Sequence, residues 1–333
     1  MEVSVLITTY NIKEYIAQTM ESVLSQKVDF AYEILVGDDG SDDGTREILT
    51  EYESRYQDQV RVYSMEREAG RKYNRVERSA ANRLNLLGKA KGKYCTFLDG
   101  DDYYTADHRL QRMVEVLERT ENEDCVMCAH NLMMVYPDGQ QAPLLRAKKE
   151  RKISMQQYWK LMFVQSNAVL FRNRYRENPP TEHCARYFDD NNIVYWLFQM
   201  GKMYYLPECM GAYRQVAGSS WNAIDCLKRS ASNMIGYAVE MELNPKGRRL
   251  SNIRHYPDYA YLFRHRKEIG QDSCDPFYST AMQHHLTEAV RVYRMGEAKG
   301  MQYLVFCLRY FTSMWGYGCA KLERALLKIT GRY

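Results

Sequence analysis

The sequence of 333 residues lacks the features that mark several common classes of protein. It has no uninterrupted run of about 18 apolar residues, so we expect no membrane-spanning helix. The segment Met1 to Ile7 has no basic region followed by a long apolar run and a cleavage site, so we expect no signal peptide. Basic and acidic residues nearly balance, at 46 and 42, which excludes the strong basic bias of a general nucleic-acid-binding protein.

The nine cysteines show no framework of paired spacings, and their odd number argues against a fully disulfide-bonded secreted domain. We therefore expect a reducing compartment and a cytoplasmic protein. Cys125, Cys128 and His130 have a spacing that zinc sites also use. Because they lie in an apolar, strand-like stretch, with only His183 and Cys184 as a second ligand pair, we favour buried reduced cysteines.

Two nucleotide-binding motifs are also missing. The sequence contains neither G-x-x-x-x-G-K-[ST] nor a G-x-G-x-x-G after its first strand, which excludes a P-loop and a dinucleotide fingerprint. If the protein binds phosphates, we expect a metal ion to do this work, since Mg²⁺ and Mn²⁺ commonly use one or two protein carboxylates together with phosphate oxygens.

Residues 1–135 alternate short apolar runs, typical of strands, with segments whose apolar positions have helical spacing. This alternation predicts an α/β fold with a mostly parallel sheet and helices on both faces. We expect residues 1–221 to form one domain and residues 222–333 a helical C-terminal region. The predicted strands cover residues 3–8, 33–36, 60–63, 94–98, 125–135 and 169–171, and the predicted helices cover residues 13–26, 76–90, 105–119, 154–163, 189 or 190 to 200, and a segment from residue 45.

Three of the predicted strands end in polar residues. These ends are Thr8 to Asn11, Asp38 to Ser41 and Asp99 to Asp102. Ligands of parallel sheets bind at the carboxyl ends of the strands, so the three ends predict one site. Carboxylates that lie close together repel unless a cation or solvent screens them, and a divalent metal with a phosphorylated ligand is the first candidate partner.

A calcium-binding EF-hand loop is an alternative for the second strand end. Asp39, Ser41, Asp43 and Gly44 fit its first six positions, but the twelfth position is Thr50 rather than Glu. The flanking segment is also a strand and not a helix, so we reject the calcium interpretation.

Three segments, VLITTYN, EILVGDDGSDDGT and GKYCTFLDGDDYY, occur in this order and closely resemble the family 2 glycosyltransferases of the GT-A fold. The similarity covers roughly residues 3–221. It implies a GT-A (Rossmann-like) sheet and an enzyme that transfers a sugar from a nucleotide diphosphate sugar, with a UDP-sugar favoured, with inversion of configuration. The family's frequent use in bacterial surface polysaccharide synthesis implies a glycan or lipid-linked acceptor at the inner face of the plasma membrane.

The resemblance also implies roles for the residues at the first two strand ends. Asp39, the second Asp of the DDGS turn, would bind the nucleobase. Thr8, Thr9 and Asn11 would contact the nucleoside. The loop Glu66 to Arg75 replaces a shorter loop of the family, and Arg71 within it is a further candidate for a nucleobase contact, in competition with Arg78 or Arg83.

At the third strand end, the resemblance assigns the D-x-D carboxylates to ribose and metal. Asp101 is the favoured ligand of Mn²⁺ or Mg²⁺, and Asp99, which would face the ribose, is the second candidate. Asp102 has no assigned role.

The later segment YFDDNNIVYWLFQMGKMYYLPECMGAYRQVAGSSW resembles the family stretch that begins with an acidic pair and ends in a Tyr-Arg motif. By this match Asp190 is the general base, whereas the alternative is that Asp189 and Asp190 merely cap a helix. Arg214 would lie near the diphosphate or the acceptor, unless it is a strand arginine that reaches into solvent. Val216 stands where many relatives have a histidine.

The stretches 303–311 and 321–328 mix bulky apolar residues with Lys and Arg. They predict either amphipathic helices that make a peripheral membrane contact or helices that pack on the catalytic domain or on another copy in a homo-oligomer. Two other functions stay open: a nucleotide-sugar-binding protein without catalysis, and a nucleotidyltransferase of similar fold. The second expects a Gly-rich basic loop after the first strand, which residues 9–13 do not supply.

Overall fold

The computed structural model describes residues 1–68, 70–71, 73–161, 164–216 and 225–245, together with residues 257, 258, 261, 264, 265, 315 and 322. The contacts divide the chain into two compact units. One contains residues 1–71 and 75–219, and the other contains residues 72–74 and 220–333. Within the described residues, none of the helices combines the length and apolar character needed to cross a membrane.

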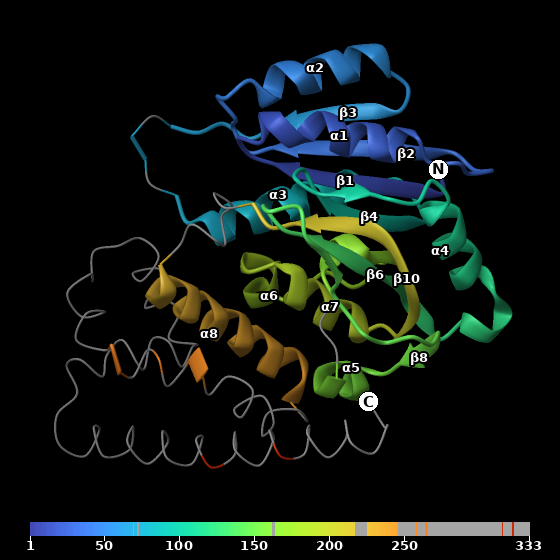
Figure 1. Cartoon of the computed structure of the whole chain (residues 1–333), viewed down its shortest axis with the longest axis vertical. Coiled ribbons are helices and arrows are strands. Elements are labelled where there is room, and N and C mark those ends of the chain that lie inside the picture. The colour runs from blue at the N-terminus through green and yellow to red at the C-terminus, as the bar shows by residue number, and fades with distance from the viewer. Residues whose placement is uncertain are drawn as a thin grey trace. The chain divides into compact units, whose positions relative to one another are not determined.

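The first unit is built on one sheet, whose described strands lie in the order β3-β2-β1-β4-β9-β6-β10-β5 (Figure 1). β1 pairs in parallel with β2 and β4, β2 with β3, and β6 with β10, whereas β9 and the short strands pair antiparallel. The predicted α/β class with a mostly parallel sheet is confirmed. The strands are β1 (Val3–Thr9), β2 (Tyr32–Asp38), β3 (Val60–Ser64), β4 (Tyr94–Asp99), β5 (Tyr103–Tyr104), β6 (Cys125–Val135), β7 (Gln141–Pro143), β8 (Arg151–Ile153), β9 (Val169–Arg172) and β10 (Lys202–Arg214).

Helices α3 and α4 each present an apolar stripe to the sheet. α3 packs on β1 and β2, and α4 packs on β6 and β9. The strands β1 and β4 are buried on both faces, as expected for central parallel strands. The helices are α1 (Lys13–Leu24), α2 (Thr45–Arg55), α3 (Arg75–Lys89), α4 (Arg109–Glu118), α5 (Met155–Leu161), α6 (Glu182–Arg186), α7 (Asp190–Phe198) and α8 (Cys226–Leu243), with single 3₁₀ turns η1 (Thr120–Asn122) and η2 (Ser166–Ala168).

Several elements differ from the sequence-based prediction: the short elements β5, β7, β8 and α6 and the long strand β10 were not predicted, and one helix begins later than expected. The strand β10 was not predicted, because its register against β6 shifts around Leu206 and Cys209 and this bulge breaks the alternation that marks a strand. The helix expected from Thr105 begins only at Arg109. The backbone N–H of Thr105 donates instead to the carbonyl of Met210, at 3.1 Å, which ties this segment to β10.

In the second unit, α8 is the longest described element. The side chain of Asp225 caps it by accepting a hydrogen bond from the backbone N–H of Lys228. Asp258 accepts hydrogen bonds from Asn233 and Tyr237 of this helix, each at 3.1 Å. The stretches 303–311 and 321–328, with the membrane or subunit contact predicted for them, lie outside the described residues except for Leu322.

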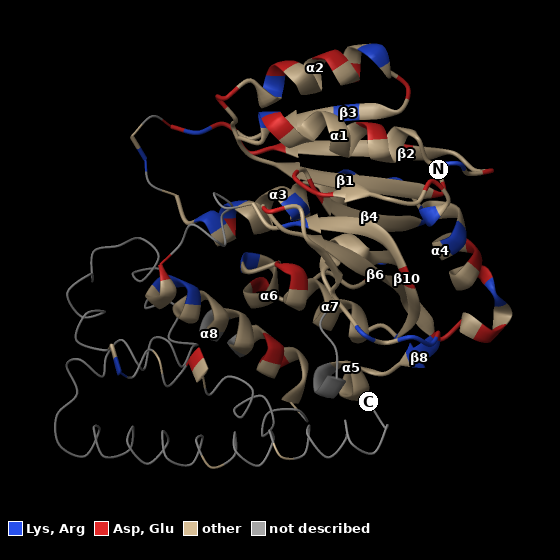
Figure 2. Ribbon diagram, viewed as in Figure 1, with Lys and Arg blue, Asp and Glu red and all other residues tan. Residues whose placement is uncertain are grey.

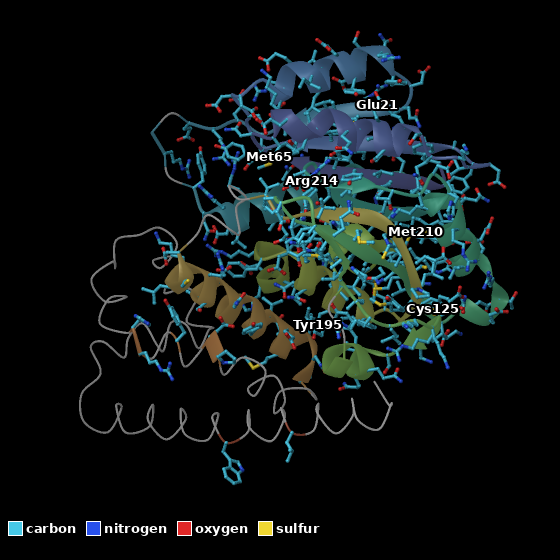
Figure 3. All side chains as sticks on the ribbon, in the orientation of Figure 1. Glu21, Met65, Cys125, Tyr195, Met210 and Arg214 are labelled. Atoms are coloured by element: carbon cyan, nitrogen blue, oxygen red, sulfur yellow. The ribbon has the colours of Figure 1, made fainter. Side chains whose placement is uncertain are left out.

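Parallel pairing places the three polar strand ends side by side. Thr9 is the register partner of Asp38 on β2, and Thr8 is the partner of Asp99 on β4. Figure 3 labels Arg214 at the end of β10 and Cys125 at the start of the neighbouring β6, which are opposite ends of the sheet. The polar strand ends and Arg214 lie at the same end.

Candidate active site

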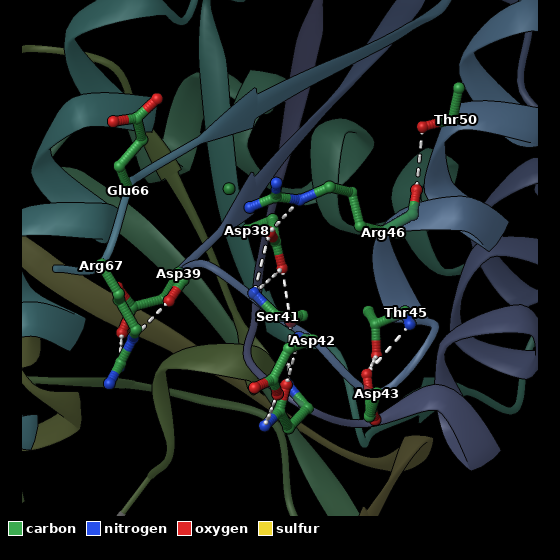
Figure 4. Close-up of polar contacts among 12 residues, drawn as sticks. Asp38, Asp39, Ser41, Asp42, Asp43, Thr45, Arg46, Thr50, Glu66 and Arg67 are labelled. Atoms are coloured by element: carbon green, nitrogen blue, oxygen red, sulfur yellow. Dashed lines mark hydrogen bonds and ion pairs between the residues drawn. The ribbon is translucent and has the colours of Figure 1, made fainter. Parts of the chain in front are cut away.

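The turn that follows β2 is organised by the buried carboxylate of Asp38 (Figure 4). This carboxylate accepts hydrogen bonds from the backbone N–H of Ser41, at 3.1 Å, and from the Ser41 hydroxyl, at 2.5 Å. Gly40, between them, has a φ of 77°, a conformation that glycine adopts at little cost. Asp38 therefore shapes the turn and is not available to a ligand.

Asn11 joins this turn to the end of β1. Its side-chain amide donates to Asp42 at 2.8 Å and accepts from the backbone N–H of Asp42 at 3.0 Å. Its backbone N–H donates to the Ser41 hydroxyl, and its φ is 50°, the left-handed region that Asn tolerates. The side chain thus holds two strand ends together, and its contact with a nucleoside stays a prediction.

Asp39 lies between two arginines. Arg78, from α3, donates to one carboxylate oxygen, with its Nε at 2.7 Å, and Arg67 binds the other oxygen and the Asp39 carbonyl. The guanidinium of Arg67 also lies over the Tyr10 ring, 3.9 Å from its centroid. The sequence analysis names Arg71 as a candidate, with Arg78 or Arg83 as competitors. The structure pairs Arg71 with Glu68 and brings Arg78, together with Arg67, to Asp39.

The end of β4 forms a tight turn against the end of β1. The Thr8 hydroxyl donates to Asp99 at 2.9 Å, and the backbone N–H of Gly100 donates to the Thr8 carbonyl at 2.8 Å. A Cβ atom on Gly100 would lie 2.4 Å from Cδ1 of Ile12, so a larger residue there would require the Ile12 side chain to move. The neighbouring hydroxyl of Thr9 is buried and has no hydrogen-bond partner among the described residues.

Asp101 and Asp102 occupy different surroundings in this turn. Burial and the charge of Asp99 raise the pKa of Asp101 to about 6. Asp102 is fully buried, and burial, together with Asp101 and Asp99, raises its pKa well above the usual range. Asp102 accepts hydrogen bonds from the backbone N–H of Arg214, at 2.8 Å, and from the Asn167 amide, at 2.5 Å. Its role is to tie β10 and η2 to the turn Asp99 to Asp102, which we call the acidic turn.

Arg214 lies directly on the acidic turn. Its guanidinium donates to the carbonyl of Asp101 and to Gln18, and it lies over the rings of Tyr103 and Tyr15, with its Cζ at 4.4 Å and 5.0 Å from the centroids. These contacts exclude the alternative of an arginine that simply reaches into solvent.

The acidic pair at the start of α7 divides into two roles. Asp189 is the N-cap, accepting from the backbone N–H of Asn192 at 3.1 Å, and burial raises its pKa to about 6. Asp190 turns toward the acidic turn, where it accepts hydrogen bonds from the hydroxyl and the backbone N–H of Ser166 and lies 3.9 Å from Arg83. The interpretation as a plain cap therefore holds for Asp189 alone.

Arg83 connects the two halves of the site. It projects from α3, its side chain is 8% exposed, and it donates to Asp99 at 3.0 Å. Since it also lies near Asp190, one guanidinium stands between the strand-end acid and the acid of α7. Figure 2 shows the acidic residues of the turn gathered with basic residues of α3 at this end of the sheet.

The residues present fit a divalent cation. In the described parts of the chain, no three or more His, Cys, Asp or Glu side chains are arranged as a ready-made metal site. A cation held by one or two carboxylates and completed by phosphate oxygens needs no such group. After burial, the charge of Asp99 is the second cause that raises the pKa of Asp101, and a divalent cation would offset the repulsion between these two carboxylates.

Sequence reasoning missed several residues of this site. Arg67, Ser166 and Asn167 belong to no motif, and they contact the acidic residues only because segments distant in the sequence fold onto the site.

His130, which was considered as a zinc ligand, is buried and accepts a hydrogen bond from Arg109 at 2.8 Å. Cys125 and Cys128 are buried free thiols.

A model described as glycosyl transferase family 2 matches residues 4–178, just over half of the chain. The match includes all three polar strand ends. The chain belongs to this glycosyltransferase family.

Two relatives illustrate the sequence similarity. An uncharacterized protein of Mycobacterium bovis is 27% identical over 228 residues, which are 66% of this chain and 60% of that protein. TuaG of Bacillus subtilis, whose name refers to a glycosyltransferase of teichuronic acid biosynthesis, is 35% identical over 118 residues, 35% of this chain and 43% of TuaG. The chain thus spans about 60% of the length of its mycobacterial relative.

Solved structures show the same fold. S. aureus TarS 1–349 in complex with UDP has a TM-score of 0.56 at 16% identity, covering 98% of this chain and 92% of that one. The mannosyltransferase PcManGT from Pyrobaculum calidifontis, in complex with GDP-Man and Mn²⁺, has a TM-score of 0.51 at 14% identity, covering 93% and 87%. These similarities confirm the GT-A fold.

Proposed function

We propose that this chain transfers a sugar from a nucleotide diphosphate sugar, with a UDP-sugar favoured, to a hydroxyl group of a glycan or lipid-linked acceptor. One observation carries the proposal: Arg83 contacts Asp99 of the acidic turn at 3.0 Å and lies 3.9 Å from Asp190. The carboxylates that would serve the donor and the acceptor therefore share one guanidinium, whose Nη2 lies near both of them.

Asp190 is the proposed general base. Burial raises its pKa, although the positive charge of Arg83 acts in the opposite direction, and a raised pKa makes a carboxylate a stronger proton acceptor. Asp190 would take the proton of the acceptor hydroxyl as that oxygen attacks the anomeric carbon. Attack from the face opposite to the leaving diphosphate inverts the configuration in a single displacement.

Asp101 is the proposed ligand of Mn²⁺ or Mg²⁺, with Asp99 as the second candidate. The bound cation would stabilise the negative charge that develops on the leaving diphosphate. Arg214, held on the Asp101 carbonyl, would add a second positive charge to the same group. PcManGT, which shares the fold, is in complex with GDP-Man and Mn²⁺, which supports a divalent cation beside the nucleotide sugar.

Asp39 is the proposed nucleobase contact, with Thr8 and Thr9 beside it at the end of β1. Two planar guanidinium groups, of Arg67 and Arg78, donate to Asp39, and this polar arrangement supports recognition of a planar nucleobase there. UDP in the complex of TarS, which shares the fold, supports a nucleoside diphosphate as part of the donor. Contacts of Asn11 and Arg71 with the nucleoside remain part of the proposal.

The remaining proposals concern the setting of the enzyme. We place the catalytic domain in residues 1–221 and the protein in the cytoplasm, which the free thiols of the described cysteines support. Residues 222–333 would serve either a peripheral contact at the inner face of the plasma membrane or a homo-oligomer.

The experiment that tests this function is a donor screen without acceptor. UDP-, GDP- and dTDP-sugars are incubated with the protein and Mn²⁺ or Mg²⁺, and release of the nucleoside diphosphate is measured, with EDTA as the control. We expect metal-dependent hydrolysis of at least one UDP-sugar. Binding of a nucleotide sugar without hydrolysis or transfer would favour a binding protein, and release of pyrophosphate from a nucleoside triphosphate and a sugar phosphate would favour a nucleotidyltransferase.

A further inference from the structure

The 3₁₀ turn η2 contacts two acidic groups that come from distant parts of the chain. Its first residue, Ser166, donates its hydroxyl and its backbone N–H to Asp190 at the start of α7. Its second residue, Asn167, donates its amide to Asp102 of the acidic turn, at 2.5 Å. One turn of backbone thus fixes the spacing between the proposed base and the strand-end acids.

The core holds this turn in place. Arg109 is fully buried, and its guanidinium donates to the carbonyl of Asn167 at 3.0 Å and to the hydroxyl of Thr96, on β4, at 3.1 Å. It also donates to Nε2 of His130, on β6, whose Nδ1 lies 2.6 Å from the carbonyl of Asn131. Because these partners belong to central strands, η2 has a rigid foundation.

The contacts on Asp190 are unevenly distributed between its two oxygens. Among the described residues, both hydrogen bonds from Ser166 and the approach of Arg83 involve Oδ1. The Asp190 side chain is 29% exposed, so the carboxylate is not closed off. A carboxylate anchored through one oxygen presents the other in a fixed direction, which is what proton abstraction requires.

We propose that Ser166 is a positioning residue, which anchors Oδ1 of Asp190 so that Oδ2 faces the acceptor hydroxyl. This inference rests on the proposed function, because it assumes that Asp190 is the base. Ser166 itself does not touch the reacting atoms. Its hydroxyl sets the orientation of the Asp190 carboxylate, which does touch them. The contacts of η2 with the core hold that hydroxyl in place.

Ser166→Ala removes the hydroxyl and leaves the backbone N–H. We expect kcat for metal-dependent hydrolysis of the UDP-sugar found in the donor screen to fall about tenfold, since a hydrogen bond to a charged group is lost. The KM for the donor and the midpoint of thermal unfolding should stay at the wild-type values. Ser166→Thr, which keeps the hydroxyl, should restore most of kcat, and Ser25→Ala, the same change at an exposed serine, serves as the control.

A double variant separates a positioning role from a general structural effect. If Ser166 acts through Asp190, Ser166→Ala should cause no further loss in an Asp190→Asn background. Two outcomes would overturn the role of Ser166 and leave the base assignment intact. One is an equal loss of kcat in both backgrounds, and the other is wild-type kcat in Ser166→Ala while Asp190→Asn is inactive. Wild-type turnover in Asp190→Asn would overturn the base assignment, and with it this inference.

Discussion

Two acidic turns, at the ends of β2 and β4, differ in how their charges are compensated. In the turn after β2, Asp38 is bound by Ser41, and Asp39 lies between Arg67 and Arg78. In the turn after β4, burial and a neighbouring carboxylate raise the pKa of Asp101 to about 6. Aspartates at the carboxyl ends of two parallel strands therefore differ in whether neighbouring side chains compensate their charge.

The difference separates carboxylates whose charge is compensated within the chain from carboxylates whose charge a bound cation would compensate. Carboxylates with N–H and guanidinium partners stabilise the ionised form and the local backbone. Buried carboxylates that repel one another cost stability, and such a cost persists where a ligand or cation is to bind. The following predictions test this contrast, from the largest expected effect to the smallest.

Replacing Asp190, the acidic residue of α7 near Arg83, should have the largest effect on catalysis. Asp190→Asn keeps the shape of the side chain but cannot accept a proton, so kcat for sugar transfer should fall about a hundredfold or more. Binding of UDP with Mn²⁺, measured by calorimetry, should change little. Transfer at the wild-type rate would show that the base lies elsewhere.

Asp101→Ala should act on metal and nucleotide binding. Calorimetry should show that Mn²⁺ strengthens UDP binding to the wild type and that this strengthening is lost in the variant, because the proposed ligand is gone. Asp29→Ala, an exposed acidic residue, is the matched control and should behave as the wild type. The same UDP affinity with and without Mn²⁺ in both the wild type and Asp101→Ala would rule out the metal role.

Conservative changes in the two turns should affect stability with opposite sign. Asp38→Asn weakens a buried carboxylate with several donors, so the free energy of unfolding should fall by about 1–3 kcal/mol. Asp101→Asn removes a partly buried charge whose pKa is raised, so the apoprotein should keep its stability or gain some. Urea denaturation measures both. A similar loss in the two variants would remove the distinction between the turns.

The pH dependence of the free energy of unfolding should differ between Asp189, at the start of α7, and Asp43, in the turn after β2. Asp189 has a pKa raised by burial to about 6, so between roughly pH 4 and 6 the folded chain binds more protons, and the free energy of unfolding falls as pH rises. Asp189→Asn, which keeps the N-cap, should reduce this fall, by about 1 kcal/mol after allowance for solvent screening.

Asp43, after β2, should behave in the opposite way. Burial tends to raise its pKa, but hydrogen bonds from Thr45 and the backbone N–H of Lys13 outweigh this and lower it. Its contribution is therefore present above its ordinary pKa and is lost as pH falls through the lowered value. Asp43→Asn should remove that loss and leave the slope between pH 4 and 6 unchanged. Denaturation series at several pH values measure both variants, and identical slopes in both would contradict the contrast.

Much of the fold follows from local patterns that the sequence displays. The buried strands at Val3 and Tyr94 are continuous apolar runs, and the helix at Arg75 has a clear apolar stripe, so their bounds were predicted within a few residues. β10 was missed, because its bulge near Cys209 and the intervening Pro207 interrupt the alternation of a strand. Local periodicity therefore reports regular elements and not irregular ones.

The candidate site shows the same limit. The strand-end acids and Asp190 belong to motifs, and the sequence alone assigned roles to them. Ser166, Arg67 and Arg109 belong to no motif, and their contacts join residues that lie between 13 and 58 positions apart. Such contacts depend on how loops close over the sheet, which no local pattern encodes.

The sequence by itself predicted that three polar strand ends would form one site, because parallel strands bring their carboxyl ends to one edge. The nucleotide-sugar donor and the role of the later acidic pair were implied by the family resemblance. Only the tertiary structure decided which acids are compensated. It placed arginines on Asp39, an N-cap role on Asp189 and a serine on Asp190, because charge balance depends on side chains that distant segments deliver. The acidic turn after β4 was left with the excess charge.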